Sequence, residues 1–265
     1  MKKRVISSIV LALIFIPLFV AGGRSYAVTM GILSLLCFKE ILDLKESHSK
    51  IPNGIVFLSM ISLLFLVLYE YQARAFSYGV SHRVLIVMSF LFFVPTLFNY
   101  KKGEYNTRDA FYLLGIVIFL GVTFNSLIWL RNTGVYYLLY VFSITVFTDI
   151  FALIVGMLIG KHHPFPTISP KKSVEGYIGG TIAGTVFASI FHYYYIPGIP
   201  ILEVVLMSLC ISLVSQVGDL FFSKIKRENN IKDFSNLIPG HGGVLDRLDS
   251  SLFAVLAYVL LLRFL

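Results

Sequence analysis

Apolar runs of about 20 residues recur along this chain, and they constrain its fold more than any other feature of the sequence. A helix needs about 20 apolar residues to cross a bilayer, where its backbone polar groups must bond to one another. The composition agrees, since 57% of the 265 residues are hydrophobic and 14% are charged, against about 45–50% and about 25% in a typical soluble domain. The sequence therefore predicts an all-α, polytopic membrane protein, built as a single integral membrane domain over residues 1–265.

The apolar runs divide the chain into nine predicted transmembrane helices. Prolines and glycines separate several of them, as at Pro52, Gly134 and Pro197. The first run follows a basic start, as in a signal peptide, but because many runs follow it we interpret it as an uncleaved helix. The predicted spans are residues 5–21, 25–38 with an extension into 39–50, 53–69, 83–99, 110–129, 135–160, 174–195, 201–223 and 250–265.

The distribution of lysine and arginine predicts the orientation of these spans. Seventeen of the 22 Lys and Arg residues fall at the N-terminus or in even-numbered loops, and five fall on the other side. Cytoplasmic loops are enriched in Lys and Arg, so the count predicts a cytoplasmic N-terminus and places both long polar loops in the cytoplasm. The same rule accounts for the net charge of +8 without a nucleic-acid partner.

One carboxylate, Asp149, lies inside the sixth predicted span. An ionisable group within a span costs about 2.5–3.5 kcal/mol on insertion scales, so it usually faces a cavity or a partner. We expect Asp149 to line a functional cavity; a structural polar contact between helices is the alternative.

The loop after this span, residues 161–176, is rich in lysine and proline. Its segment from Ser169 to Ser173 includes Lys171 and Lys172 and leads into a helix that we expect Ser173 to cap. Lysines and free backbone amides at the start of a helix favour phosphate binding. A plain cytoplasmic loop of positive charge is the alternative interpretation.

The longest strongly polar run, residues 223–249, lies between the last two predicted spans. Just before it, Asp219, Ser223 and Lys226 are spaced to share one face of a helix. At its end, Asp246 and Asp249 are three residues apart at the start of the last helix. Carboxylates that converge from two helix ends are hard oxygen ligands suited to Mg²⁺.

The rest of this run supplies a glycine turn and cations. Glycines around His241 let the backbone approach a ligand and point amides at an anion, and Lys224, Lys226, Arg227 and Lys232 could hold phosphates. Metal ligands, a glycine turn and cations are what phosphoryl or nucleotidyl transfer requires. A solvated loop explains the charges, but it does not explain a carboxylate within a span.

These residues resemble the signature of the phosphatidate cytidylyltransferase (CDP-diacylglycerol synthase) family. The matching positions are Ser223, Ile225, Lys226, Arg227, Lys232, Asp233, Ser235, Ile238, Pro239, His241, Gly242, Gly243, Val244, Asp246, Arg247 and Asp249. The segment from Ser169 to Gly176 is similar to a second block of that family. The resemblance covers the C-terminal half from about Asp149, whereas residues 1–130 carry spans and no motif.

The chain departs from the family pattern after Asp149. Members of the family often carry an aromatic residue and an arginine there, and Leu153 and Met157 stand in those two places. The departure concerns any substrate contact expected at those two positions, and it does not concern the metal site.

The resemblance implies transfer of the cytidylyl group of CTP to phosphatidic acid, which gives CDP-diacylglycerol and pyrophosphate in bacterial phospholipid biosynthesis. It implies an Mg²⁺-dependent nucleotidyltransferase in the cell's inner (plasma) membrane, with its active site on the cytoplasmic side. The nucleophile would be the lipid phosphate, which is largely ionised at neutral pH because the second pKa of a phosphate monoester is about 6. No strong general base is then needed. Clustered carboxylates leave room for a second cation, and a homodimer is compatible with this interpretation.

The resemblance also suggests a role for each candidate residue. Asp219 and Asp246 would be the principal Mg²⁺ ligands, with Asp249 as an additional or supporting one. Cations would stabilise the triphosphate and the leaving pyrophosphate: Lys226, Arg227, Lys232 and Arg247. Substrate would be bound by Ser169, Lys171, Lys172, Ser173, Ser223, His241, Gly242, Gly243 and Asp149.

Two other classes of function remain open at this point. A transporter or channel could use Asp149 and Asp219 along its pathway, but it would place polar residues along several spans. A polyprenol or other lipid kinase would not need the whole C-terminal signature. A purely structural membrane protein is a further alternative.

Overall fold

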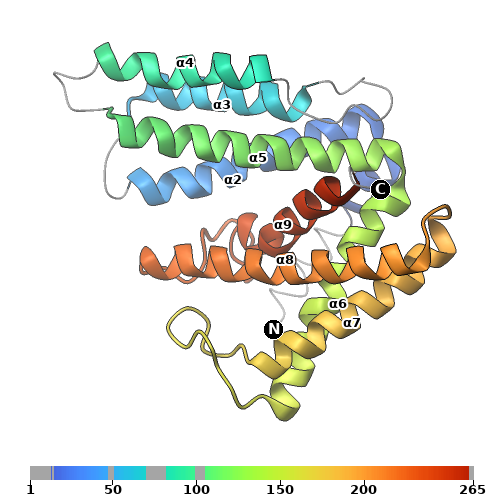
Figure 1. Ribbon diagram of the computed structural model, residues 1–265. Helices are drawn as coiled ribbons and strands as arrows, with labels where there is room; N and C mark the ends of the chain where they lie inside the picture. Colours follow the sequence, from blue (N-terminus) through green and yellow to red (C-terminus); the bar gives the residue numbers. More distant parts are fainter. Residues whose placement is uncertain (1–12, 14, 47–50, 70–81, 99–104, 263–265) are drawn as a thin grey trace. The chain divides into compact units, whose positions relative to one another are not determined.

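The computed structural model describes residues 13, 15–46, 51–69, 82–98 and 105–262, and every regular element among them is an α-helix (Figure 1). Strands are absent from these described ranges, which hold only an isolated β-bridge between Ile238 and Gly242. The all-α prediction is therefore confirmed for this part of the chain. The helices are α2 (Gly23–Glu46), α3 (Asn53–Leu68), α4 (His82–Phe98), α5 (Thr107–Thr133), α6 (Val135–Ile159), α7 (Val174–Tyr195), α8 (Ile201–Glu228) and α9 (Leu245–Leu262).

Four of the described helices, α5 to α8, are long and apolar enough to cross a membrane. Helices α3 and α4 are shorter and apolar. Helix α2 continues without a break to Glu46, so the mixed stretch after residue 38 is helical as far as the structure describes it. The first predicted span, residues 5–21, lies mostly outside the described residues. The count of nine spans and the orientation of the N-terminus stay predictions.

The chain divides into two compact units. The first holds Met1–Trp129 together with Leu237–Val244, and the second holds Leu130–Asn236 together with Leu245–Leu265. The first boundary falls about where the N-terminal residues 1–130, which carry no motif, come to an end. The prediction that both units form a single membrane domain stays a prediction.

In the first unit, polar contacts fix the helix ends around an apolar core. The N-terminus of α5 is capped by Asn106, whose Oδ1 accepts from the backbone N–H of Arg108 at 2.9 Å. One turn into α5, the buried Asp109 forms a 2.8 Å ion pair with Lys45 of α2. The hydroxyl of Tyr112 donates to the carbonyl of Ile41 at 3.2 Å, so α2 and α5 are joined at two levels.

In the second unit, glycines let α7 pack closely on α6. A Cβ added at Gly180 would lie 2.5 Å from the carbonyl oxygen of Thr148, and one at Gly176 would lie 2.7 Å from that of Ala152. Small residues four apart on one face are the usual means by which membrane helices approach each other. The glycine face of α7 therefore sets the spacing between α6, whose interior carries Asp149, and α7, whose N-terminus is capped by Ser173.

Hydroxyl and amide groups form a seam between α6, α7 and α8. Four hydrogen bonds between side chains link these helices: Tyr140 to Ser208 at 2.6 Å, Thr148 to Ser212 at 2.8 Å, Gln216 to Thr181 at 2.7 Å and Ser189 to Ser208 at 3.3 Å. These groups find partners inside the bundle, where lipid offers none. The seam holds α8 in register with α6 and α7, and hence positions Asp219 one turn beyond Gln216.

Candidate active site

Four carboxylates and two lysines gather where α6, α8 and α9 and the loop before α7 meet in the second unit. Lys172 of that loop forms an ion pair with Asp219 of α8. Lys226, two turns further along α8, lies 2.8 Å from Asp246 and 4.0 Å from Asp249, both on the first turns of α9. Asp149 of α6 accepts a hydrogen bond from Ser250 at 3.3 Å. We call these six charged residues the lysine–carboxylate cluster: Asp149, Lys172, Asp219, Lys226, Asp246 and Asp249.

The carboxylates of the cluster repel one another. The pKa of Asp249 is raised to about 7, first by burial and then by the charges of Asp219 and Asp149, whereas Lys226 acts in the opposite direction. Such an arrangement attracts further positive charge. A divalent cation, or a substrate phosphate drawn in by the lysines, would therefore find complementary groups here.

The cluster is open at one end and buried at the other. The side chains of Lys172 and Asp219 are 30% and 22% exposed, whereas those of Lys226 and Asp246 are 11% and 3% exposed. A ligand can therefore reach the Lys172–Asp219 pair directly. We refer to Lys172–Asp219 as the open pair and to Lys226–Asp246 as the buried pair.

Asp246 anchors the polar loop between α8 and α9. Its Oδ1 accepts from Lys226 at 2.8 Å, and its Oδ2 accepts from the backbone N–H of Phe234 at 2.8 Å. The Lys226 ammonium also lies 5.4 Å from the centre of the Phe234 ring. Asp246 therefore stabilises this loop, in addition to the role as a metal ligand that is predicted for it.

The segment before α7 folds as the sequence predicts. Ser173 has extended backbone angles and its Oγ accepts from the backbone N–H of Gly176 at 3.1 Å, so the predicted N-cap is confirmed. Glu175 accepts from the backbone N–H of Lys161 at 3.1 Å and contacts the ring of His162 at 2.6 Å, which closes the loop. Because Ser173 is buried and its hydroxyl caps the helix, its direct contact with a phosphate stays a prediction.

The two polar loops are joined by Arg227. Its Nε donates to the carbonyl of Ile168 at 3.2 Å, and its guanidinium also donates to the carbonyl of Ile231 at 3.0 Å. The side chain of Ser223 donates to Asp219 at 3.4 Å, which confirms that these two residues share a face of α8. Ser169 accepts from the backbone N–H of Lys172 at 3.2 Å and so shapes the same loop.

Three predicted site cations are exposed and, within the described part of the chain, form no ion pair: Lys171, Lys232 and Arg247. They are available to an incoming phosphate. The structure does not bring them into the lysine–carboxylate cluster, and their roles stay predictions.

The glycine turn belongs to the first unit. The backbone N–H of Ile238 donates to the carbonyl of Gly242 at 2.9 Å, and that of His241 donates to the carbonyl of Ile238 at 2.9 Å. Gly240 and Gly242 have φ angles of 79° and 84°, which side chains disfavour. The turn is thus confirmed as a turn. The approach of His241 to the lysine–carboxylate cluster stays a prediction.

The cluster has the donor chemistry of a magnesium site but not a preformed ligand set. Within the described residues, no three His, Cys, Asp or Glu side chains are arranged to hold a metal ion. In this structure Asp219 and Asp246 are bonded to lysines, which supply the positive charge. Carboxylate oxygens are the ligands that Mg²⁺ prefers. The residues therefore fit a cation that binds together with substrate oxygens.

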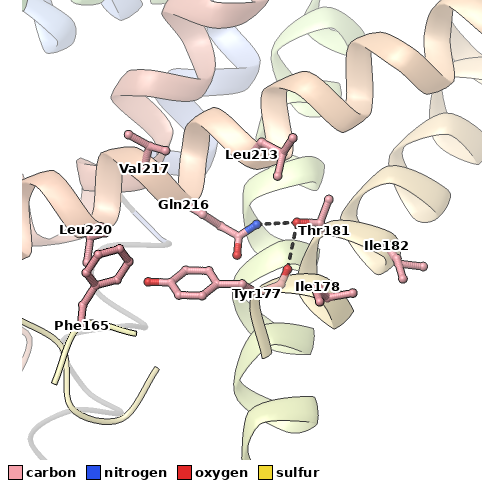
Figure 2. Close-up of a pocket in the computed structure, with 9 residues that line it drawn as sticks. All are labelled: Phe165, Tyr177, Ile178, Thr181, Ile182, Leu213, Gln216, Val217 and Leu220. Atoms are coloured by element: carbon pink, nitrogen blue, oxygen red, sulfur yellow. Dashed lines mark hydrogen bonds between the residues drawn. The ribbon is translucent and has the colours of Figure 1, made fainter. Parts of the chain in front are cut away.

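An apolar groove of about 390 Å³ lies beside the open pair, between α7 and α8 (Figure 2). Tyr177, at the edge of the groove, has the Lys172 ammonium 5.7 Å from its ring centre, and Leu220 follows Asp219 directly on α8. The sequence does not predict this groove, because it depends on how the apolar side chains of two helices pack. Its lining residues are Phe165, Tyr177, Ile178, Thr181, Ile182, Leu213, Gln216, Val217 and Leu220.

The sequence analysis also missed a buried carboxylate of the first unit, Glu40 of α2. It lies on the buried face of the helix with Cys37, Ile41 and Leu44, and it accepts from the backbone N–H of Val244 at 2.9 Å. Its spacing from those apolar residues could have identified it in the sequence, since a lone carboxylate on an apolar helix face requires a partner.

Comparison with known proteins assigns the chain to a family. The sequence model of the cytidylyltransferase family matches residues 2–265. The chain belongs to the cytidylyltransferase family.

Similar proteins of known name extend this finding. The chain is 33% identical over 255 residues to a phosphatidate cytidylyltransferase of Staphylococcus haemolyticus (strain JCSC1435), and the match covers 96% of both chains. It is 31% identical to a protein of the same name from Staphylococcus aureus (strain COL), again over 96% of both chains. The resemblance drawn from the motifs is confirmed, and it extends to the N-terminal half that carries no motif.

Proposed function

We propose that this protein transfers the cytidylyl group of CTP to phosphatidic acid and releases pyrophosphate, which gives CDP-diacylglycerol for bacterial phospholipid biosynthesis. The observation that carries the proposal is the open pair, Lys172–Asp219, which lies at the ends of apolar helices and beside an apolar groove. Charged groups for a phosphate and an apolar surface for a lipid thus occur together. The names of the similar proteins and the family membership support the same reaction.

The chemistry requires positioning and positive charge more than acid–base catalysis. An oxygen of the lipid phosphate forms a bond to the α-phosphorus of CTP, and the bond from that phosphorus to the β-phosphate oxygen breaks. The lipid phosphate is largely ionised at neutral pH, so it needs no base. Lys172 and Lys226 offset the negative charge that gathers in the transition state. Arg227 and Lys232, which follow Lys226 in the sequence, and Arg247, which follows Asp246, would stabilise the departing pyrophosphate.

The proposal includes Mg²⁺ held by Asp219, Asp246 and Asp249, with room for a second cation. The repulsion among the carboxylates and their oxygen chemistry support this assignment. Bound Mg²⁺ would neutralise charge on the phosphates of CTP. Asp149 would line the same cavity, and the turn of His241, Gly242 and Gly243 would bind the nucleotide.

The groove between α7 and α8 would hold an acyl chain of the lipid. Several of its side chains are apolar and outward-facing, including Ile178, Ile182 and Val217. An acyl chain lying there would place its phosphate beside Lys172, which borders the groove through Tyr177. One lipid molecule could therefore place its acyl chain in the groove and its phosphate beside Lys172 without a large rearrangement of the protein.

The proposed setting is the inner (plasma) membrane, with nine spans, a cytoplasmic N-terminus and the active site on the cytoplasmic side. The distribution of lysine and arginine supports this orientation. A homodimer is kept as part of the proposal and is tested by the mass of the purified protein in detergent.

The proposal is tested by incubating the purified protein with CTP, phosphatidic acid and Mg²⁺. CDP-diacylglycerol and pyrophosphate should form in equal amounts, and chelation of Mg²⁺ should stop the reaction. Folded protein that forms no CDP-diacylglycerol would overturn the proposed reaction. Full activity after chelation would overturn the Mg²⁺ assignment alone.

A further inference from the structure

The glycine turn is bound by the carboxylate of Glu40, which lies far away in the sequence, on α2. Glu40 is 4% exposed, and its Oε1 accepts from the backbone N–H of Val244, 204 residues away, at 2.9 Å. A buried carboxylate without partners is strongly disfavoured, so this contact stabilises both groups. Glu40 and the turn belong to the same compact unit.

The fit between Glu40 and the turn depends on a residue without a side chain. A Cβ added at Gly243 would lie 2.7 Å from the Cδ of Glu40, closer than real Cβ atoms come to other atoms. A side chain at this position would force the Glu40 carboxylate to shift from its place against the backbone. Gly243 therefore serves as a contact surface for Glu40, a purpose the sequence alone does not reveal.

The contact fixes the end of the turn that leads into α9. The turn closes on itself through two hydrogen bonds between Ile238, His241 and Gly242. These two bonds fix the shape of the turn, but they do not fix its position relative to α2. Val244 is followed directly by Leu245, the first residue of α9, and Asp246 comes next. Val244, which donates the hydrogen bond to Glu40, is thus two residues before Asp246, a member of the lysine–carboxylate cluster.

We propose that Glu40 is a positioning residue for cytidylyl transfer, which acts by fixing the glycine turn of Gly240 to Val244 in place for CTP. This inference rests on the proposed function of the turn in binding CTP. It gives the N-terminal half, which carries no motif, a direct task in the reaction. Glu40 itself does not contact the reacting atoms.

The inference predicts a selective effect on CTP. In Glu40→Ala the N–H of Val244 loses its acceptor, and kcat/KM for CTP should fall about tenfold or more while KM for phosphatidic acid stays within about twofold. In Glu40→Gln the amide oxygen still accepts, so the loss should stay within about threefold. Asp43→Ala removes an exposed carboxylate from the same helix and serves as the matched control, with unchanged kinetics.

A double-mutant cycle tests whether Glu40 acts through the turn. Gly243→Ala should cost about tenfold in kcat/KM for CTP by itself, and clearly less in the Glu40→Ala background, where the clashing side chain is gone. If Glu40→Ala does not fold, Glu40→Asp, which shortens the side chain by one methylene, replaces it in the same cycle. Additive losses would overturn the inference.

Two other results would also overturn it. One is equal loss for both substrates together with a lowered melting temperature, which would make Glu40 a purely structural residue. The other is normal CTP kinetics in folded Glu40→Ala.

The variant His241→Ala separates this inference from the proposed function of the turn on which it rests. If His241→Ala leaves KM for CTP unchanged, the turn does not bind CTP, and both the proposed function of the turn and the inference fail. If His241→Ala raises KM and Glu40→Ala does not, only the inference fails.

Discussion

The two lysine–carboxylate pairs of the second unit have the same chemistry and opposite surroundings. Lys172–Asp219 is partly exposed and joins a loop to α8, whereas Lys226–Asp246 is buried and joins α8 to α9. An exposed pair exchanges partners at low cost, while breaking a buried pair by removing one partner costs about 3–5 kcal/mol. The difference suggests a division of labour, in which the open pair meets the substrates and the buried pair holds the site in shape.

The largest expected effect on the reaction comes from the open pair. Asp219→Asn removes a charge that Lys172 and a bound cation would share, and kcat should fall by about 10²–10³ with little change in melting temperature. The measurement is the rate of CDP-diacylglycerol formation by purified protein over a range of Mg²⁺ concentrations. Glu203→Gln, which alters a carboxylate in the first turn of the same helix, is the matched control. Activity above about a tenth of wild type would remove Asp219 as a metal ligand.

The buried pair should combine loss of activity with loss of stability. Asp246→Asn removes the nearer charged partner of Lys226 and leaves only Asp249, 4.0 Å away, and we expect the free energy of unfolding to fall by about 3–5 kcal/mol. The measurement is thermal unfolding in detergent, compared with Asp219→Asn under the same conditions. The comparison between the two pairs fails if Asp219→Asn proves the more destabilising of the two.

How much of this site the sequence predicts depends on how local each contact is. The cap at Ser173 and the shared face of Asp219 and Ser223 involve residues three or four apart, and both were predicted correctly. The pairing of Lys172 with Asp219 joins residues 47 apart, and it requires the packing of α7 on α8. Charge patterns identify residues that need a partner, but only the fold selects which partner each one meets.

The same reasoning explains two omissions in the sequence analysis. The sequence analysis named no polar contact between spans apart from that of Asp149, whereas hydroxyls such as those of Thr148 and Ser212 form a seam between helices. Serine and threonine can bond to their own helix backbone, so their sequence positions do not reveal a partner. The groove between α7 and α8 likewise arises from apolar side chains that are no different in kind from their neighbours.

A smaller and more selective effect is expected in that groove. Ile182→Trp would fill part of the space beside Thr181, and KM for phosphatidic acid should rise about three- to tenfold while KM for CTP is unchanged. Ile154→Trp, on an exposed apolar face of α6 outside the groove, is the matched control. Equal effects of the two substitutions would show that the acyl chain lies elsewhere.

The smallest effect is expected for a third ion pair, on the solvated end of α8. Lys224 and Glu228 lie 3.6 Å apart and are more than half exposed. Lys224→Ala should change the free energy of unfolding by less than about 0.5 kcal/mol, and activity should stay within about twofold of wild type. A loss comparable to that of Asp219→Asn would contradict this expectation and would support the phosphate-holding role that the sequence allows for Lys224.

The position of a radioactive label tests the central claim most directly. CTP labelled in the α-phosphate or in the γ-phosphate is incubated with the purified protein, phosphatidic acid and Mg²⁺, and the lipid is separated from pyrophosphate. Cytidylyl transfer predicts that the α-label enters the lipid and the γ-label leaves with pyrophosphate. A lipid labelled from the γ-position would indicate a lipid kinase, and a lipid labelled from neither position would contradict group transfer altogether.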